Sequence, residues 1–393
     1  MAAKTVTLGV SELEVSSVCL GTMTFGTAAC PEETAVAILD RYVELGGNFI
    51  DTSEVYPVPL DVATWPETVG NGEEIIGRWL AARPEAREKV VIATKVTPSP
   101  VAELAKAKAS REKALTGEFD DGGDPACDFS REQIRRACEA SQKRLGVSCI
   151  DVYQLHWPER PTYNVAGGEV QYKPDGVVGR GSVAPDEQAT RQATQGFDAI
   201  ATTMGELIAE GKIKSWGLCN ETPYGVCTHH STCQRLGVAP PVSIQNGFSL
   251  TYRQFEGDLA EACAPHHCNL SLLAYGVLNG GVLSGKYLPG GDALPTSRYN
   301  VETYVLQPHY KSDAANIAVE QYAALAKQHG LAPADLASAW AHSRWFAGAV
   351  IIGATSVAQL EANWKASTIK LSEEVLQQIE AVHMKRRNPN CVD

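Results

Sequence analysis

The stretch Asn48-Phe-Ile-Asp-Thr-Ser-Glu-Val-Tyr56 is the part of the sequence on which the fold prediction depends. Its apolar start predicts a short strand that ends at Asp51, in a polar loop that carries Tyr56. Two later apolar runs end in the same way, on Lys95 and on His156. Four side chains that can hold or transfer a proton therefore lie at three predicted strand ends.

Short β-rich runs alternate along the whole chain with longer segments of helical period. The predicted strands are 16–23, 48–53, 90–95, 149–156, 213–220, 242–248, 271–276 and 349–354. The predicted helices are 31–45, 73–82, 130–145, 186–210, 222–236, 255–264, 314–328, 333–346, 357–366 and an added C-terminal helix, 372–384. Pro31 suits the start of the first helix and Ser130 the cap of the third.

Eight strand–helix units predict one α/β domain, residues 1–393, folded as a (β/α)8 TIM barrel of parallel strands. The alternative is a doubly wound open sheet, which usually has about six strands and a Gly-x-Gly-x-x-Gly turn after the first of them. No such turn follows the first predicted strand. The barrel is therefore the preferred fold.

Three segments are longer than a minimal barrel needs: 57–72, 97–129 and 159–185. Each follows a predicted strand, so in a barrel all three lie at the carboxyl ends of the strands. Long loops on that face more often build a substrate pocket than decorate a surface. The aromatic residues that are candidates for lining this pocket are Trp65, Trp157 and Tyr163.

The charge balance argues against a nucleic acid as partner, because the formal net charge is −12 and the pI is near 5.3. The N-terminal sequence Met-Ala-Ala-Lys-Thr-Val-Thr-Leu has no apolar signal-peptide core. No run reaches the roughly 18 apolar residues of a membrane helix. We therefore expect a cytoplasmic protein without a membrane partner, and the sequence leaves its oligomeric state open.

The cysteine and histidine residues do not predict a metal site. Four cysteines have histidine neighbours, but their spacings match no zinc motif: Cys227, Cys233, Cys263 and Cys268. We expect the pairs His229-His230 and His266-His267 to be polar residues on the surface of helices.

In a barrel, the ends of consecutive strands meet at one mouth, which brings Asp51, Tyr56, Lys95 and His156 together. A lysine ammonium about 4 Å from a phenol, at an effective dielectric of about 20, favours the phenolate by roughly 4 kcal/mol, or about three pK units. We expect Lys95 to lower the pKa of Tyr56 in this way and Asp51 to hold Lys95, while His156 orients a substrate oxygen. Such a set is a general acid for a developing alkoxide. The alternative is a lyase or hydrolase in which Lys95 forms a Schiff base.

These motifs resemble the aldo-keto reductase family over essentially the whole chain. Phe-Ile-Asp-Thr-Ser, Ile-Ala-Thr-Lys and Tyr-Gln-Leu-His-Trp-Pro place the family's catalytic tetrad on Asp51, Tyr56, Lys95 and His156. The opening strand, Leu20-Gly-Thr-Met-Thr-Phe-Gly26, is also similar. Tyr56-Pro-Val-Pro59 and the long loop after the fourth strand look most similar to the bacterial Tas-type branch.

The resemblance implies NADPH bound across the barrel mouth without a Rossmann domain. Asn220 and Gln245 are then expected to hold the nicotinamide carboxamide, and Tyr275 to stack on the ring. The glycine-rich loop 276–286 is expected to cover the pyrophosphate, and its bare backbone N–H groups suit a phosphate independently of the family. The N-terminus of the last barrel helix is expected to hold the adenosine end. The full set of expected cofactor contacts is Gly21, Thr22, Met23, Asp51, Asn220, Gln245, Tyr275, Gly276, Leu278, Gly280, Leu283, Gly285, Lys286, Arg298, Gly353, Thr355, Ser356, Gln359 and Asn363.

Three positions depart from the family's pattern. Cys219 stands where most members have a serine that contacts the carboxamide. Gln359 replaces an arginine near the 2′-phosphate, and Ala362 replaces a frequent glutamate. The changes at Gln359 and Ala362 affect the expected preference for NADPH over NADH. NADH is therefore kept as the less favoured alternative.

The function implied by the resemblance is NADPH-dependent reduction of a small carbonyl compound, with Tyr56 as general acid. The alternative is an NADP(H)-binding redox sensor similar to the potassium-channel β subunits, with little turnover and a docked partner. The long loops on the substrate side favour the enzyme.

Overall fold

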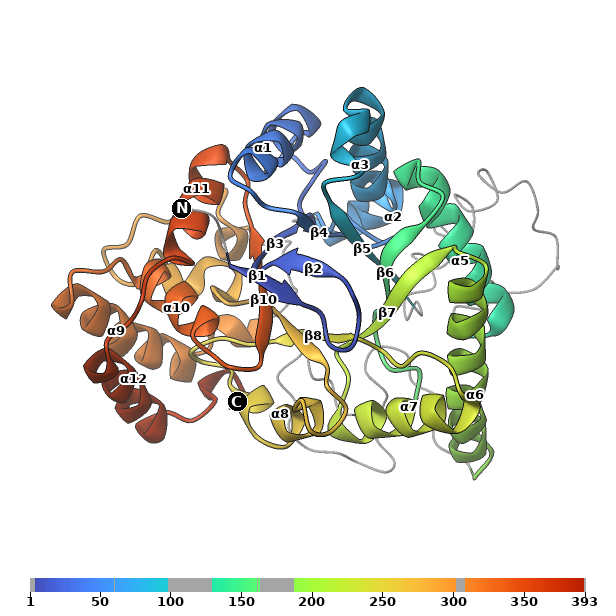
Figure 1. The fold of residues 1–393 in the computed structure, drawn as a ribbon. Helices are drawn as coiled ribbons and strands as arrows, with labels where there is room; N and C mark the ends of the chain where they lie inside the picture. Colours follow the sequence, from blue (N-terminus) through green and yellow to red (C-terminus); the bar gives the residue numbers. More distant parts are fainter. Residues whose placement is uncertain are drawn as a thin grey trace.

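A closed ring of eight parallel strands lies at the centre of the computed structural model, which describes residues 4–59, 61–97, 129–160, 162, 187–301 and 308–391. The strands of the ring are β3 Val18–Gly21, β4 Phe49–Asp51, β5 Val91–Val96, β6 Ile150–Leu155, β7 Ile213–Cys219, β8 Ser243–Gly247, β9 Ser271–Tyr275 and β10 Ala347–Gly353. Each pairs in parallel with the next, and β10 pairs with β3 (Figure 1). Because the ring closes, the predicted (β/α)8 barrel is confirmed and the open doubly wound sheet is wrong.

Helices surround the ring and lead from one strand to the next (Figure 1). They are α1 Glu32–Glu44, α2 Trp65–Thr68, α3 Asn71–Ala82, α5 Arg131–Leu145, α6 Glu187–Ala209, α7 Pro223–Leu236, α8 Asp258–Cys263, α9 Asp313–Gln328, α10 Pro333–His342, α11 Val357–Ala366 and α12 Glu373–Lys385. As predicted, Ser130 caps α5: its side chain accepts a hydrogen bond from the Gln133 backbone N–H at 3.3 Å.

Two helices are shorter than predicted. Gln254–Glu256 form a separate 3-10 turn, η4, so α8 begins only at Asp258. At the other helix, α10 ends before Ser343, whose hydroxyl donates to the Trp340 carbonyl oxygen at 2.6 Å. A side chain that bonds to the preceding turn competes with continuation of the helix.

A hairpin that the sequence pattern does not predict covers the amino end of the ring. Its strands, β1 Thr5–Thr7 and β2 Glu14–Ser16, pair antiparallel and cross the near opening in Figure 1. Leu8 and Val15 of this hairpin are fully buried and pack with interior side chains such as Phe49. Strands of three residues contain too few alternations to give a periodic signal.

The interior of the ring has a polar layer above an apolar one. The apolar layer contains Cys19, Phe49, Ala93, Val152, Leu273 and Ala349, which belong to one buried cluster. Side chains two residues apart on a strand point to the same face, so Asp51, Lys95 and Gln154 face the interior one layer higher. The polar groups of the barrel therefore lie at its carboxyl end, above an apolar floor.

The prediction that His229 lies on a surface is wrong. His229 is 3% exposed, because this face of α7 packs on α6 and on the ring. Its imidazole lies between the rings of Phe197 and Trp216, with centroid distances of 4.5 Å and 5.6 Å. His266 and His267 are exposed as predicted, but they lie in the turn after α8.

Burial of His229 predicts an acid-labile fold. Burial lowers the pKa of this histidine from 6.5 to about 4, so the unfolded chain binds more protons between these values. The stability held above pH 6.5 is therefore lost as the pH falls toward 4, by about 3 kcal/mol from this residue. In His229→Phe, urea unfolding should lose about 3 kcal/mol less between pH 7 and pH 4 than in the native protein. An identical loss in this variant would contradict the assignment, and His266→Gln is the exposed control.

Candidate active site

Asp51 and Lys95 form a buried ion pair at the tips of β4 and β5. The Lys95 Nζ donates to Asp51 Oδ2 at 2.7 Å and to the Thr52 carbonyl oxygen at 2.8 Å. The other oxygen of Asp51, Oδ1, accepts hydrogen bonds from the amides of Gln154 at 3.1 Å and Gln245 at 2.8 Å. Lys95 is 0% exposed and Asp51 2% exposed. Two amides and one ammonium therefore satisfy a carboxylate that is shielded from water.

Lys95 keeps its charge in this site. Burial lowers the pKa of the ammonium, but the adjacent Asp51 carboxylate raises it, and the net result is a pKa above the ordinary value. The predicted role of Asp51 as the residue that holds Lys95 therefore agrees with the geometry.

Tyr56 lies against this pair, with the Lys95 Nζ 4.8 Å from the centroid of its ring. Burial raises the pKa of Tyr56 to about 12, while the charge of Lys95 acts in the opposite direction. The predicted direction of the effect of Lys95 is right, but the predicted net lowering of the pKa is wrong because burial outweighs it. At neutral pH the phenol therefore carries its proton and is a hydrogen-bond donor.

His156 stands beside Tyr56, with the two rings edge to face and their centroids 6.0 Å apart. Its backbone N–H donates to the Val96 carbonyl oxygen at 2.9 Å, which fixes the chain just past β6. The ring Nδ1 lies 3.2 Å from Ser53 Oγ and 2.7 Å from Thr97 Oγ1. The structure thus brings together all four predicted catalytic residues.

The three residues predicted to bind the nicotinamide also lie at this mouth. The Tyr275 hydroxyl donates to Asn220 Oδ1 at 2.7 Å, and Asn220 Nδ2 donates to the His156 carbonyl oxygen at 3.0 Å. Gln245 pairs in register with Cys219 and points toward Asp51. Asn220 Nδ2 also lies 3.4 Å from the sulfur of Cys219.

Further residues predicted to contact the cofactor lie at the strand ends on the other side of Asp51. Gly21 is paired in register with Asp51 on one side and with Gly353 on the other. The Thr22 backbone N–H and hydroxyl both donate to the Asp51 carbonyl oxygen at 3.0 Å. Met23 follows directly, and its carbonyl oxygen accepts from the Val58 N–H at 2.8 Å. These residues form the rim of the mouth next to the ion pair.

The residues predicted for the adenosine end gather at the N-terminus of α11. Ser356 caps this helix by accepting from the Gln359 N–H at 3.2 Å. The side-chain oxygen of Gln359 accepts from the Thr355 N–H at 2.9 Å, and Asn363 Nδ2 donates to the Gly353 carbonyl oxygen at 3.3 Å. The Gln359 side chain therefore stabilises the turn that contains Thr355.

The loop 276–286 makes the 3-10 turn η5, Asn279–Ser284, through glycines with left-handed φ angles. Gly280 and Gly281 have φ values of 62° and 102°. A Cβ at Gly281 would lie 3.0 Å from Lys286 Nζ, and one at Gly280 would lie 3.2 Å from an Arg298 guanidinium nitrogen. Burial and the neighbouring Arg298 lower the pKa of Lys286. The other predicted loop contacts are Gly276, Leu278, Leu283 and Gly285, of which Leu283 is buried.

Comparison with known proteins agrees with this arrangement. The model of the Aldo/keto reductase family matches residues 17–383. The chain belongs to this family. Protein tas of Escherichia coli strain K12 is 37% identical over 373 residues, which are 95% of each chain. An aldo-keto reductase of Babesia bovis is 32% identical over 309 residues, 77% of this chain and 98% of that one. The uncharacterized oxidoreductase YrpG of Bacillus subtilis strain 168 is 27% identical over 372 residues, 95% of this chain and 93% of that one.

Membership makes the chain an oxidoreductase by family, and the resemblance to the Tas-type branch is confirmed by the similarity to Protein tas. Among the described residues, no group of three or more His, Cys, Asp or Glu side chains is arranged to hold a metal ion. In the same part of the chain, no helix is long and apolar enough to cross a bilayer.

Several site residues of this aldo-keto reductase are missed by the sequence analysis. Gln154 contacts Asp51 and Gln245, and its place two residues before His156 on a strand was the available signal. Ser53 and Thr97 contact the imidazole of His156, but hydroxyl side chains in loops give no comparable signal.

The candidate substrate-lining aromatics differ in their surroundings. Trp65 donates its indole N–H to the Val55 carbonyl oxygen at 2.7 Å, so it packs the loop 57–72 against the chain that carries Tyr56. Trp157 stacks on His156, with ring centroids 6.2 Å apart. Tyr163 lies outside the described residues, as do most of the segments 97–129 and 159–185.

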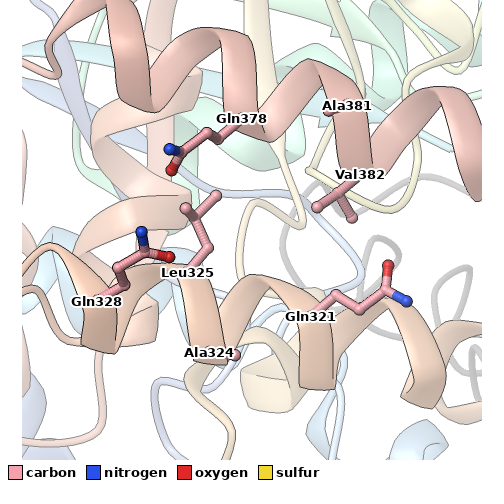
Figure 2. Close-up of a pocket in the computed structure, with 7 residues that line it drawn as sticks. All are labelled: Gln321, Ala324, Leu325, Gln328, Gln378, Ala381 and Val382. Atoms are coloured by element: carbon pink, nitrogen blue, oxygen red, sulfur yellow. The ribbon is translucent and has the colours of Figure 1, made fainter.

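A separate groove of about 360 Å³ lies between α9 and α12 (Figure 2). Its lining residues are Gln321, Ala324, Leu325, Gln328, Gln378, Ala381 and Val382. None of them is ionisable and none belongs to the predicted site, so this groove has no part in the chemistry considered below.

Proposed function

We propose that this protein is an NADPH-dependent carbonyl reductase. Bound NADPH would supply the hydride for the carbon of an aldehyde or ketone. The contact of Tyr56 with the buried pair of Asp51 and Lys95 is the observation that carries this proposal. It holds a protonated phenol beside a fixed positive charge, which favours proton donation to an oxygen that becomes negative.

The protonation of Tyr56 supports its role as acid. A phenol with a raised pKa stays neutral until an alkoxide, which is a much stronger base, develops next to it. The Lys95 charge then stabilises the phenolate that remains, because Lys95 is fully buried and its Nζ lies 4.8 Å from the centroid of the Tyr56 ring. The proton thus leaves Tyr56 only when the transition state needs it.

The proposed role of His156 requires the tautomer that carries its ring proton on Nε2. Thr97 Oγ1 at 2.7 Å and Ser53 Oγ at 3.2 Å both lie close enough to the His156 Nδ1 to donate a hydrogen bond to it. An Nδ1 that accepts leaves the ring proton on Nε2. In the proposed reaction this N–H donates to the carbonyl oxygen and orients it toward Tyr56.

The residues at the mouth fit a nicotinamide dinucleotide. Asn220 offers an amide for the carboxamide, and Tyr275 offers a ring at the same edge. The cations Lys286 and Arg298 both lie against the left-handed glycines of the loop 276–286. Burial and Arg298 lower the pKa of Lys286 although Asp292 acts in the opposite direction, and a bound phosphate would interact favourably with both cations.

The choice of NADPH over NADH rests on these two cations and on the cap of α11. Gln359 is engaged with Thr355 and adds no charge for a 2′-phosphate. Ser356 and the N-terminus of α11 remain suited to an anion. Lys286 and Arg298 are the positive charges proposed to compensate for the missing arginine.

The test follows the absorbance of reduced nicotinamide when the purified protein is mixed with an aromatic aldehyde. We expect multiple turnovers with NADPH and slower turnover with NADH run in parallel. Faster turnover with NADH would overturn the cofactor assignment. NADPH binding without turnover would instead support a redox-sensing protein similar to the potassium-channel β subunits, and no binding at all would overturn both functions.

A further inference from the structure

Asn220 adopts a backbone conformation that is unusual for a residue with a side chain. Its φ angle is +54°, in the left-handed region, which asparagine tolerates better than other residues that carry a Cβ. Its side chain joins two parts of the site, since it bonds both the His156 carbonyl oxygen and the Tyr275 hydroxyl. The direction of this amide therefore depends on the backbone conformation, so groups that hold the adjacent backbone also position the amide.

The next residue, Glu221, is held through its backbone by Asn246. The Asn246 Oδ1 accepts from the Glu221 N–H at 3.2 Å, and its Nδ2 donates to the Glu221 carbonyl oxygen at 2.9 Å. Asn246 is 1% exposed and follows Gln245 at the end of β8. The buried Asn246 amide thus binds both the backbone N–H and the carbonyl oxygen of Glu221. It thereby fixes the peptide unit directly after Asn220.

Glu221 is also held through its side chain. Arg160 donates to its carboxylate from two nitrogens, at 2.8 Å and 2.5 Å. The carboxylate also accepts from the Thr222 N–H at 2.6 Å, at the start of α7. The contact is tight, because a Cβ on Gly225 would lie 2.2 Å from the carboxylate oxygen. The ion pair is buried, with 10% and 3% of the two side chains exposed.

We propose that Arg160, Glu221 and Asn246, which we call the Glu221 clamp, are positioning residues of the nicotinamide site. They hold Glu221 through its side chain and through both its backbone groups, and thereby keep Asn220 in the left-handed conformation that directs its amide into the site. Arg160 follows β6 and lies four residues after His156. The Glu221 clamp thus connects the segment after β6 with the residues proposed to bind the nicotinamide. This inference rests on the proposed function.

The test compares two ligands that share the adenosine half of the cofactor. NADPH reaches Asn220 with its carboxamide, whereas 2′,5′-ADP has no nicotinamide. Isothermal titration of Asn246→Ala should show about tenfold weaker binding of NADPH and a change within about twofold for 2′,5′-ADP. Equal losses for both ligands, or no loss for NADPH, would overturn the proposal.

A second variant and a control keep the test independent of folding. Arg160→Met should show the same selective loss, and Arg160→Lys should recover part of it, so these variants decide the matter if Asn246→Ala does not fold. Arg144→Met removes another buried ion pair, with Glu73 at 2.6 Å, which joins α5 to α3. It should leave the ratio of the two affinities unchanged. Failure of the native protein to bind NADPH would instead refute the proposed function.

Discussion

Replacing Tyr56 with Phe is expected to lower turnover of an aldehyde by at least about 100-fold, because a general acid typically contributes this much or more. The affinity for NADPH should stay unchanged, since the hydroxyl is proposed to act on the substrate oxygen alone. The phenyl ring keeps the contact with the Lys95 ammonium, whose Nζ lies 4.8 Å from the ring centroid. Steady-state kinetics and NADPH fluorescence titration measure the two quantities separately.

A control variant removes the hydroxyl of a buried tyrosine outside the site. Tyr322 donates to the Leu250 carbonyl oxygen at 3.2 Å and is 2% exposed, but it lies on α9, away from the ion pair. Tyr322→Phe should keep its turnover. If Tyr56→Phe retained turnover to within a few-fold, Tyr56 would not be the acid.

Replacing Lys95 with Met is expected to damage both activity and stability. The change leaves the Asp51 carboxylate buried without its ammonium, and breaking a buried ion pair in this way typically costs about 3–5 kcal/mol. Turnover should fall at least as far as in Tyr56→Phe, because the phenolate loses the charge that stabilises it. Urea unfolding and turnover with saturating NADPH give the two results.

The double variant Lys95→Met/Asp51→Asn separates the two effects. Removing both charges should restore much of the stability, since no unpaired carboxylate remains. Turnover should stay low, because the site still lacks a positive charge. Recovery of turnover together with stability would show that Lys95 acts only on folding, which contradicts its assigned role.

The barrel was predictable because its signal is repeated along the chain. Each strand–helix unit contributes a change of hydrophobic period, and the strand ends place Asp51, Lys95 and His156 on one side of the ring without any knowledge of loops. The hairpin Thr5–Ser16 gives no such repeated signal, because each of its strands has three residues.

The missed features depend on distances that a sequence does not contain. The pKa of Tyr56 is a balance between burial and the charge of Lys95, and the depth of burial depends on tertiary packing. His229 lies in a polar-looking segment of a helix, but the partners of that face are the rings of Phe197 and Trp216 from distant segments. Asn246 likewise acquires its role only when β7 and β8 lie side by side.

The hairpin at the amino end of the barrel affects the route by which solvent protons reach Tyr56. The buried side chains of Leu8 and Val15 fill that end of the barrel, and the apolar layer around Phe49 separates it from the buried Lys95. Among the described residues, this apolar layer closes the amino end of the barrel, so we expect solvent protons to reach Tyr56 from the mouth. In the proposed reaction, substrate and cofactor occupy this mouth while Tyr56 gives up its proton. The proposed cycle therefore requires Tyr56 to regain a proton from solvent after the product has left.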